Sequence, residues 1–552
     1  MPATEMLAPE FDPRYVLDDP ADRTFTFRQD RMHFPFPVCP LWQSIHPQGF
    51  SSGLTTASGE LNMPMVGYWI RYRNHYQYET PVFAEPASEE EAQRRAALTE
   101  ATLQAQFPLM IQRWNEEHLP QIQEFFLQIN RIIDADPATI GPETIDELEA
   151  IHRALWTIHF RIVTPGLMSQ QMFDEFYADV MGPESDPYAL QVGVTMKSIE
   201  RGIALSDLAA RAQELGLAPL FLGSSPDEIS ARLPESESGR SFLDAMHEYL
   251  EAFGYHMDLF DFVAPTWKEE PAPLFSALRP YLETGRDNRA EHAARARASA
   301  EALAEVRETL LAYPEPIRAQ FEALLSFALD ASFLHEEHNF YIDQQALSRM
   351  RIAFLTVGKA LVLHGVINAP DDIFMLTLDE TRGALREDLS DVRSEVAERR
   401  ASLAAAWQDN PPPFVGAPPA GPPPDNLGSR AMGRFFGTPP APSADPSVVM
   451  GTGGSAGTVT ALAYVARTLE EATAIPAGHV LVTVTTTPQW TPLFGIVAAV
   501  VTETGGPLSH GAIVAREYAI PAVVGAFGAT QRISTGDSIT VDGAKGTIRL
   551  HA

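Results

Sequence analysis

His510 stands at a junction where the residue types favour phosphorus chemistry. An apolar run ends in Gly505-Gly506, and a short helix is predicted to begin near Ser509, which places His510 in the first helical turn. Free backbone N–H groups and the positive end of the helix dipole gather there and suit a phosphate. The same field favours the neutral, nucleophilic imidazole. We predict that His510 attacks phosphorus and carries the phosphoryl group; the alternative is a histidine that only caps a helix.

Two further features of this junction fit a bulky anionic group. The paired glycines Gly505 and Gly506 let the backbone come close to such a group. Arg516 follows His510 by about two helical turns. Its guanidinium would reach phosphate oxygens if the helix curves or a partner closes over it.

A second group of reactive side chains lies in LHEEHNFYIDQQ (334–345). Transfer of a phosphoryl group to a hydroxyl needs a base beside the attacking oxygen and an apolar or aromatic pocket for the rest of the acceptor. On a helix, Glu337 and Tyr341 are four residues apart and share a face. We predict that His338 is the base and that Glu337 or Asp343 orients it. The alternative is a helix with ordinary polar residues.

Other imidazole and aromatic side chains are candidates for walls of the acceptor pocket. His33 precedes Pro35 and Pro37, which stiffen its segment. The remaining candidates are Trp69, Tyr72, His75, Tyr76, Tyr78, His256 and Trp267. Packing in a core or an interface is the alternative for each of them.

The elements that must position these residues change character along the chain. Residues 1 to about 85 are rich in aromatics and proline and predict irregular segments with a strand or hairpin. Residues 88–407 show apolar residues at helical spacing, which predicts a mainly helical region. Residues 450–552 predict an α/β segment, with a helix at LSHGAIVAREY and a hairpin turning near Asp542-Gly543.

Between these regions, twelve prolines fall from Pro411 to Pro446. Proline fixes φ and removes a hydrogen-bond donor, so we predict neither helix nor sheet there, but a partly polyproline tether between two bodies that move relative to each other. The predicted domains are 1–408 for acceptor binding, 409–449 for the tether and 450–552 for the α/β carrier. The fold class is thus multidomain, a mainly α-helical domain followed by an α/β domain.

The charge disfavours nucleic acid and anionic membranes as partners. The 552 residues carry a formal net charge of −32. Cys39 is the single cysteine, so no internal disulfide and no cysteine-based metal site is predicted. No signal peptide or run of about 18 apolar residues is visible, which predicts a cytoplasmic protein without a membrane span.

The segment TETGGPLSHGAIVAREYAIPAVVG resembles the phosphohistidine swivelling domain of the PEP-utilising enzymes. That family includes pyruvate phosphate dikinase, PEP synthase and rifampin phosphotransferase. The resemblance extends over roughly 450–552 and includes TTTPQWTPLF (485–494). It implies that His510 is the phosphorylated histidine and that Thr487 and Trp490 lie on the face near it.

Other segments resemble the acceptor subunits of the two-subunit aryl phosphate synthases, such as phenylphosphate synthase and 4-cresyl phosphate synthase. FRQDRMHFPFPVCPLW near the N-terminus carries this likeness, and HGVINAPDDIFMLTLDE (364–380) is similar to the end of the acceptor domain in the rifampin phosphotransferase branch. The sequence shows neither the Gly-rich phosphate loop of an ATP-grasp domain nor a PEP-binding barrel.

The resemblance therefore implies a division of labour between two subunits. An ATP-grasp partner would bind ATP and Mg²⁺ and pass the β-phosphoryl group to His510, giving AMP and phosphate. The carrier would then deliver the group to a phenolic hydroxyl. The alternatives are the same chemistry with another alcohol or an antibiotic, and a phosphocarrier that binds no small acceptor.

Overall fold

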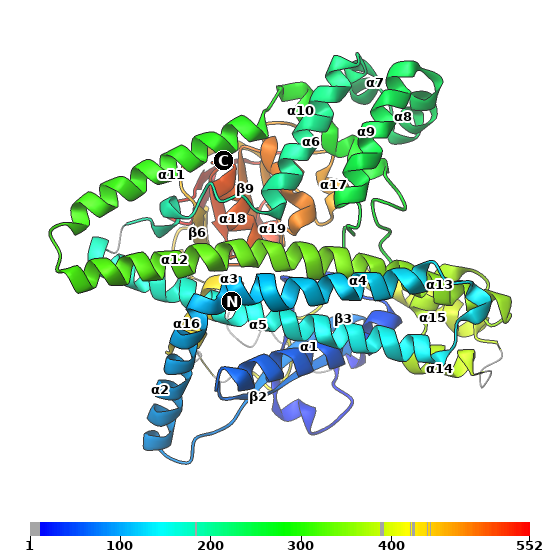
Figure 1. The fold of residues 1–552 in the computed structure, drawn as a ribbon, viewed down its shortest axis with the longest axis horizontal. Helices are drawn as coiled ribbons and strands as arrows, with labels where there is room; N and C mark the ends of the chain where they lie inside the picture. The colour runs from blue at the N-terminus through cyan, green and yellow to red at the C-terminus, as the bar shows by residue number, and fades with distance from the viewer. Residues whose placement is uncertain are drawn as a thin grey trace. The chain divides into compact units, whose positions relative to one another are not determined.

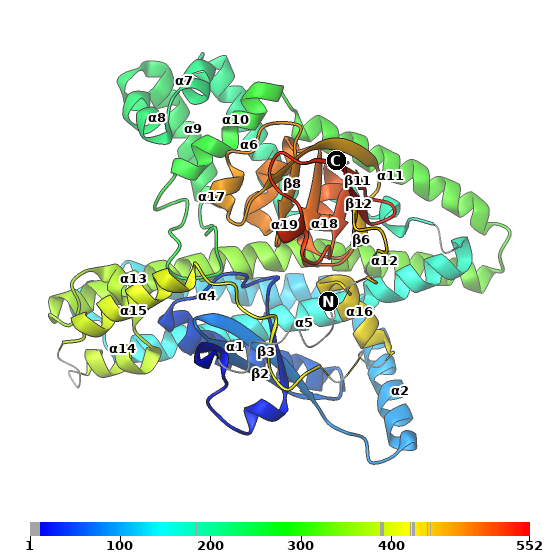
Figure 2. The same ribbon diagram turned by 180° about the vertical axis from the view of Figure 1, so that it is seen from behind.

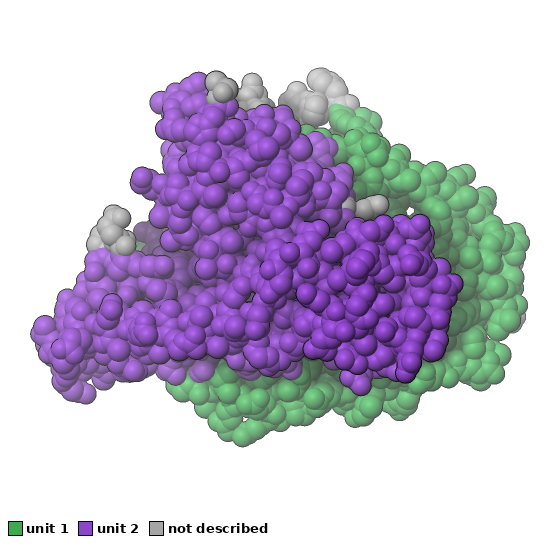
Figure 3. Space-filling model, turned by 90° about the horizontal axis from the view of Figure 1, so that it is seen from above, with its two compact units in different colours: residues 1–166, 259–264, 338–423 green, residues 167–258, 265–337, 424–552 purple. Residues whose placement is uncertain are grey.

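The computed structural model describes residues 12–182, 185–386, 391–419, 421, 425–438, 440–441 and 443–551. The chain divides into two compact units, coloured differently in Figure 3. Unit 1 contains residues 1–166, 259–264 and 338–423, and unit 2 contains residues 167–258, 265–337 and 424–552.

Unit 1 is built on a four-stranded antiparallel sheet in the order β2-β3-β1-β4. Its strands are β1 (Thr26–Gln29), β2 (Met65–Arg73), β3 (Tyr76–Phe83) and β4 (Phe414–Gly416). Helix α1 (Pro40–Glu60) packs against β2. Apolar residues of this helix and this strand form a core with two aromatic residues, Trp156 and Phe160.

Helices α4 (Leu119–Ile133) and α13 (Leu347–Leu363) of unit 1 pack against the π-helix Asn339–Ala346, which contains Tyr341 and Asp343. The other α-helices that lie wholly in unit 1, besides α1, are α2 (Glu89–Gln106), α3 (Met110–Arg113), α14 (Leu378–Leu385) and α15 (Arg393–Ala406). Two π-helices, Trp114–His118 and Asn339–Ala346, interrupt the α-helical pattern. The long helix α5 (Pro142–Met181) supplies residues to both units.

The first part of unit 2 is helical. Its helices are α6 (Lys197–Glu214), α7 (Ala218–Gly223), α8 (Pro226–Arg232), α9 (Glu237–Phe253), α10 (Ala272–Thr284), α11 (Asn288–Leu310), α12 (Glu315–His338) and α16 (Leu427–Phe436). An apolar core joins α6 to α10, with fully buried Phe221, Phe242 and Leu278 at its centre.

The second part of unit 2 is an eight-stranded sheet in the order β5-β12-β11-β7-β8-β9-β10-β6. Its strands are β5 (Val448–Met450), β6 (Thr452–Ser455), β7 (Thr458–Val465), β8 (Val480–Thr483), β9 (Ala499–Thr502), β10 (Ala522–Val524), β11 (Ser538–Asp542) and β12 (Thr547–Leu550). The strands from β7 to β10 are parallel neighbours, and β8, β9 and β10 are buried along their whole length, as is typical of parallel strands inside a sheet. Helix α18 (His510–Glu517) packs beside β6, β9 and β10 (Figures 1 and 2).

The predicted fold class is confirmed: a helical region precedes an α/β region, and β11 and β12 form the expected hairpin. Two local predictions are wrong. The N-terminal segment contains the 21-residue α1, which tolerates Pro47 in its interior. The proline-rich stretch contains β4 and α16, because non-proline residues at 414–416 and 427–436 supply enough backbone donors. The domain boundaries and the tether remain predictions.

None of the helices in the described part of the chain is long and apolar enough to cross a membrane.

Candidate functional site

His510 lies where the sequence predicts it, at the start of a helix that follows a buried strand. Strand β9 ends at Thr502, Ser509 is the N-cap in extended conformation, and α18 begins at His510. The imidazole is 11% exposed. The junction of strand, glycine turn and helix is therefore present, with the imidazole in the first turn.

Two side chains contact the two ring nitrogens of His510. Nδ1 lies 3.5 Å from Oε1 of Glu336 on α12, and Nε2 lies 3.4 Å from the hydroxyl of Thr491. Burial alone would raise the pKa of Glu336, but hydrogen bonding and the positive charge of His510, together with His335, lower that pKa to about 2. The ionised carboxylate therefore favours a proton on Nδ1, which leaves the Nε2 lone pair as the nucleophile.

The glycine turn before His510 packs against α16, and its predicted approach to a phosphate stays a prediction. The backbone N–H groups of Gly505, Gly506 and Leu508 donate to the carbonyls at the C-terminal end of α16, at distances of 2.9–3.1 Å. A side chain at Gly506 would collide with the carbonyl oxygen of Arg434. These glycines therefore allow α16 to lie close to the turn. In return, the N–H groups of the turn satisfy the last carbonyls of α16.

This packing predicts the effect of Gly506→Ala. The new methyl group has to displace backbone atoms of α16, and overpacking of this kind costs about 1–3 kcal/mol. We expect a lower midpoint in urea unfolding followed by circular dichroism. Gly223→Ala is the matched control, because a methyl group there meets nothing within 4 Å. Equal midpoints for the two variants would contradict the packing described for the turn.

Of the other residues predicted around His510, Arg516 and Trp490 have structural partners of their own, whereas Thr487 has an unpaired hydroxyl. Arg516 donates to the carbonyls of Gly454 (2.8 Å) and Pro507, and its guanidinium lies over the ring of Tyr188. Thr487 is the N-cap of the short helix Pro488–Gly495, and its hydroxyl oxygen is buried without a hydrogen-bond partner. Trp490 is buried in an apolar cluster. Their roles in phosphate binding remain predictions.

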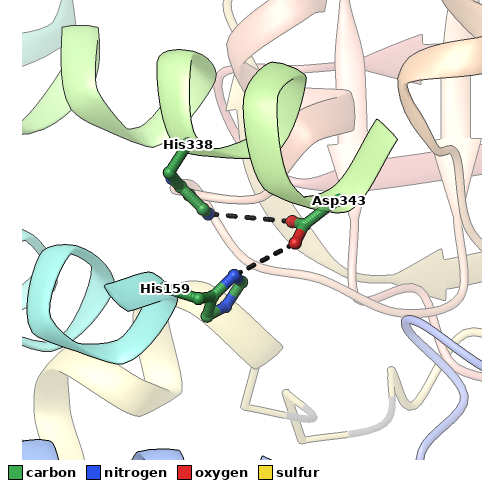
Figure 4. A group of neighbouring side chains, drawn as sticks. All are labelled: His159, His338 and Asp343. Carbon is green, nitrogen blue, oxygen red and sulfur yellow. Dashed lines mark hydrogen bonds and ion pairs between the residues drawn. The ribbon is translucent and has the colours of Figure 1, made fainter. Parts of the chain in front are cut away.

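In unit 1, His338 and Asp343 meet as predicted, and a third residue joins them. Asp343 Oδ2 lies 3.8 Å from His338 Nε2, and Asp343 Oδ1 lies 3.1 Å from Nδ1 of His159 (Figure 4). His338 and Asp343 are five residues apart, and Asn339–Ala346 is a π-helix, in which positions i and i+5 share a face. The π-turn therefore brings the carboxylate to the imidazole.

The charges of this cluster are fixed by its partners. Burial opposes ionisation of Asp343, but the charge and hydrogen bond of His159 and the charge of His338 outweigh it and lower its pKa. The pKa of His33 also depends on Asp343. Burial alone would lower this pKa, but the carboxylate of Asp30, 2.9 Å from Nδ1, raises it overall. The charge of Asp343 adds to the rise.

The remaining predicted acceptor residues lie elsewhere. Glu337 accepts a hydrogen bond from the backbone N–H of Lys197 (3.2 Å) and burial raises its pKa to about 7, so Asp343, and not Glu337, is the carboxylate beside His338. Tyr341 packs against Trp114, with ring centroids 5.8 Å apart.

The broader set of aromatic candidates is mostly structural. Tyr76 and Tyr78 are buried in the core of unit 1, and the hydroxyl of Tyr72 donates to Gln77. Trp69 packs edge-on against Phe25, and His75 lies within hydrogen-bonding distance of Gln43 and Ser402. His256 and Trp267 belong to unit 2, where their rings contact each other.

Three residues that sequence reasoning did not single out complete these arrangements: Glu336, Thr491 and His159. Glu336 lies inside the segment chosen for the acceptor base, and Thr491 lies inside the segment that resembles the family. Only their pairing with His510 is new. His159 is 184 residues from Asp343, and no local spacing indicates that contact.

The cluster His159, His338 and Asp343 is also the one group of described residues whose ligand atoms, all within 4.8 Å of one another, could hold a metal ion. Two imidazoles suit a transition metal, whereas Mg²⁺ prefers oxygen ligands and octahedral geometry. The cluster therefore does not fit the Mg²⁺ that the resemblance implies.

Comparison with known proteins agrees with this geometry. Residues 475–546 match the mobile domain of PEP-utilising enzymes, and residues 159–335 match the fourth domain of rifampicin phosphotransferase. The chain is 33% identical to chondramide synthase cmdD of Chondromyces crocatus over 98% of its own length, which is 14% of that protein. It is 28% identical to the uncharacterized phosphotransferase YvkC of Bacillus subtilis, over 93% of this chain and 60% of the relative. It is 31% identical to a rifampicin phosphotransferase of a Streptomyces species, over 64% of this chain and 39% of the relative.

The matched mobile domain of PEP-utilising enzymes contains His510, and the chain is similar over most of its length to proteins named phosphotransferases. The chain spans 60% or less of the length of each of these three relatives.

Proposed function

We propose that this chain takes a phosphoryl group onto Nε2 of His510 and passes it to a phenolic hydroxyl, giving an aryl phosphate. ATP is the proposed donor, bound with Mg²⁺ by a separate ATP-grasp partner that releases AMP and phosphate. The observation that carries the proposal is the environment of His510: a buried imidazole at a helix N-terminus, with an ionised carboxylate at Nδ1 and a hydroxyl at Nε2.

The first step follows from these contacts. The Nε2 lone pair forms a bond to phosphorus while the bond from phosphorus to its leaving group breaks. The ring keeps its proton on Nδ1 and becomes positively charged, and the carboxylate of Glu336 lies where it stabilises that charge. In the second step the acceptor oxygen attacks phosphorus, the N–P bond breaks with its electron pair returning to His510, and the hydroxyl proton passes to His338.

The surroundings of the His159–His338–Asp343 cluster support an aromatic acceptor. The ring of Trp156 lies 4.7 Å from that of His159 and 4.9 Å from that of His46. His46 is stacked on Trp42, and both of its ring nitrogens are buried without a hydrogen-bond partner. We take these unpaired nitrogens in an aromatic environment as the support for an acceptor with an aromatic ring and a polar atom.

The proposal is tested with the full chain, after its His510 has been phosphorylated with phosphoramidate. The labelled protein is mixed with phenol, 4-cresol, an aliphatic alcohol and rifampicin, and the loss of the phosphoryl group is followed by intact mass. Faster loss with the two phenols, with formation of the aryl phosphate, supports the proposal. Loss to rifampicin alone would select an antibiotic acceptor, in line with the relatives' names, and no acceptor-dependent loss would select a phosphocarrier.

Glu336→Gln isolates the first step. The substitution keeps the size of the side chain and removes a charge that, with a pKa of about 2, is present at every pH between 5 and 8. We expect phosphorylation of His510 by phosphoramidate to slow by about 10- to 100-fold, the effect of losing a charged hydrogen-bond partner. If Glu336→Gln is phosphorylated at the wild-type rate across pH 6–8, Glu336 has no role in this step.

A further inference from the structure

A buried arginine lies one hydroxyl group away from the nucleophilic nitrogen of His510. Arg201 on α6 is 6% exposed, and its Nη2 donates to the hydroxyl of Thr491 at 3.4 Å. That same hydroxyl lies 3.4 Å from Nε2 of His510. The guanidinium and the imidazole thus flank one side-chain oxygen, and all three residues belong to unit 2.

The position of the guanidinium is fixed from several sides. Its Nη1 lies within hydrogen-bonding distance of Nδ1 of His256, at 3.2 Å. The helix that carries Thr491, Pro488–Gly495, packs against α6 and α10. The carbonyl of Gly495 at the end of that helix accepts a hydrogen bond from Arg286 at 2.8 Å. Arg201 and Thr491 are therefore held by elements that pack directly on one another.

A second hydroxyl, that of Thr486, lies at the first turn of α18 and, unlike that of Thr491, has no hydrogen-bond partner. Thr486 is 6% exposed, and its Oγ1 is buried without a hydrogen-bond partner. This atom lies against Gly511, the residue after His510, so closely that a side chain there would meet it. A buried hydroxyl without a partner destabilises the fold unless a ligand atom satisfies it. An oxygen acceptor beside the first turn of α18 would do so.

The space between Arg201 and Thr491 limits what can bind there. A small pocket is lined by Arg201, Gly202, Leu205, Tyr249, Trp267, Tyr281 and Thr491. It has room for about one water molecule, far less than the several hundred Å³ that an aromatic acceptor needs. The pocket therefore excludes an aromatic acceptor from this side of Thr491. The guanidinium and the hydroxyl that line it are groups that donate to the oxygens of a phosphoryl group held on His510.

We propose that Arg201, Thr491 and Thr486 form a phosphoryl-binding site, in which the guanidinium and the two hydroxyls hold the oxygens of the group carried on Nε2 of His510. This inference rests on the proposed phosphorylation of His510 and adds the residues that bind the phosphoryl oxygens. The bound dianion is shielded from water and charge-balanced by Arg201, so the site slows hydrolysis of the N–P bond until an acceptor takes the group.

The lifetime of the phosphorylated chain tests the site. Phosphoramidate transfers its phosphoryl group to Nε2 as its own P–N bond breaks and ammonia leaves, and the label is followed by intact mass after removal of the reagent. We expect Arg201→Ala to shorten the half-life of the phosphohistidine at least about tenfold, and Arg201→Lys to shorten it less. Arg211→Ala, on the same helix but in an exposed ion pair, is the matched control with an unchanged half-life.

The outcomes separate this inference from the proposed function. If the wild-type chain is labelled on His510 and Arg201→Ala loses the label at the wild-type rate, the phosphoryl-binding site is refuted and the proposed function stands. If His510→Ala is labelled as readily as the wild type, the proposed function fails. In that case the phosphoryl-binding site is tested separately, by measuring the affinity for inorganic phosphate by calorimetry. Equal affinities of the wild type and a folded Arg201→Ala chain would refute the site.

Discussion

Replacing His510 with alanine is expected to abolish phosphoryl transfer by this chain. The lone pair of Nε2 is the proposed nucleophile, and no other described side chain at the start of α18 could replace it, because Ser509 is buried in the N-cap and is a far weaker nucleophile. We expect His510→Ala to reduce the formation of aryl phosphate at least about 10⁴-fold. The measurement is product formation by the full chain with the proposed ATP-grasp partner, ATP, Mg²⁺ and a phenol.

The control for this variant is His551→Ala, which removes an exposed imidazole from the same α/β region. It should leave both labelling and turnover near the wild-type level. Product that accumulates at a normal rate in His510→Ala would show that the phosphoryl group reaches the acceptor without this histidine.

The site around His510 and the His159–His338–Asp343 cluster differ in how far the sequence predicts them. The site around His510 is local: a buried strand, a glycine turn and a helix start follow one another within ten residues, so the sequence places the imidazole correctly. Its partner Glu336 lies 174 positions earlier, and only the packing of α12 in unit 2 brings the carboxylate to Nδ1. Periodicity within one segment contains no information about such a contact.

The pairing of His338 with Asp343 is one of the two predicted alternatives, but α-helical spacing does not account for it. An α-helical reading of 334–345 pairs His338 with Ile342 and Glu337 with Tyr341, at a spacing of four. The structure has a π-helix from Asn339, so the spacing that matters is five, and His338 meets Asp343. Wide turns of this kind depend on tertiary packing and have no sequence signature of their own.

Proline content also gives a wrong prediction of secondary structure at two places in the chain. Pro47 within α1 and the twelve prolines around β4 and α16 all predict irregular structure. In α1 the apolar residues Leu41, Ile45 and Leu54 are buried against neighbouring elements, and this burial outweighs the lost hydrogen bond. In α16 the C-terminal carbonyls find donors in the turn before His510. Tertiary contacts therefore override the local preference at both places.

The second large effect is expected at the acceptor base. His338→Asn removes the imidazole while leaving a polar side chain of smaller size next to Asp343. We expect transfer from phosphorylated His510 to a phenol to fall by about 10²- to 10⁴-fold, the usual contribution of general base catalysis. Labelling of His510 by phosphoramidate should be unchanged, because His338 takes no part in that step. The exposed His364→Asn in the same unit is the control.

The pH dependence of the transfer step distinguishes a base from a residue that only supports the fold. Asp343 has a lowered pKa, so it stays ionised between pH 5 and 8 and contributes no titration of its own. A histidine base must be neutral to accept the hydroxyl proton, so the wild-type transfer rate should rise with increasing pH. In His338→Asn this rise should disappear. A variant that is slower at every pH but keeps the same rise would assign the proton to another group, and His159, on the other oxygen of Asp343, would then be the residue to replace.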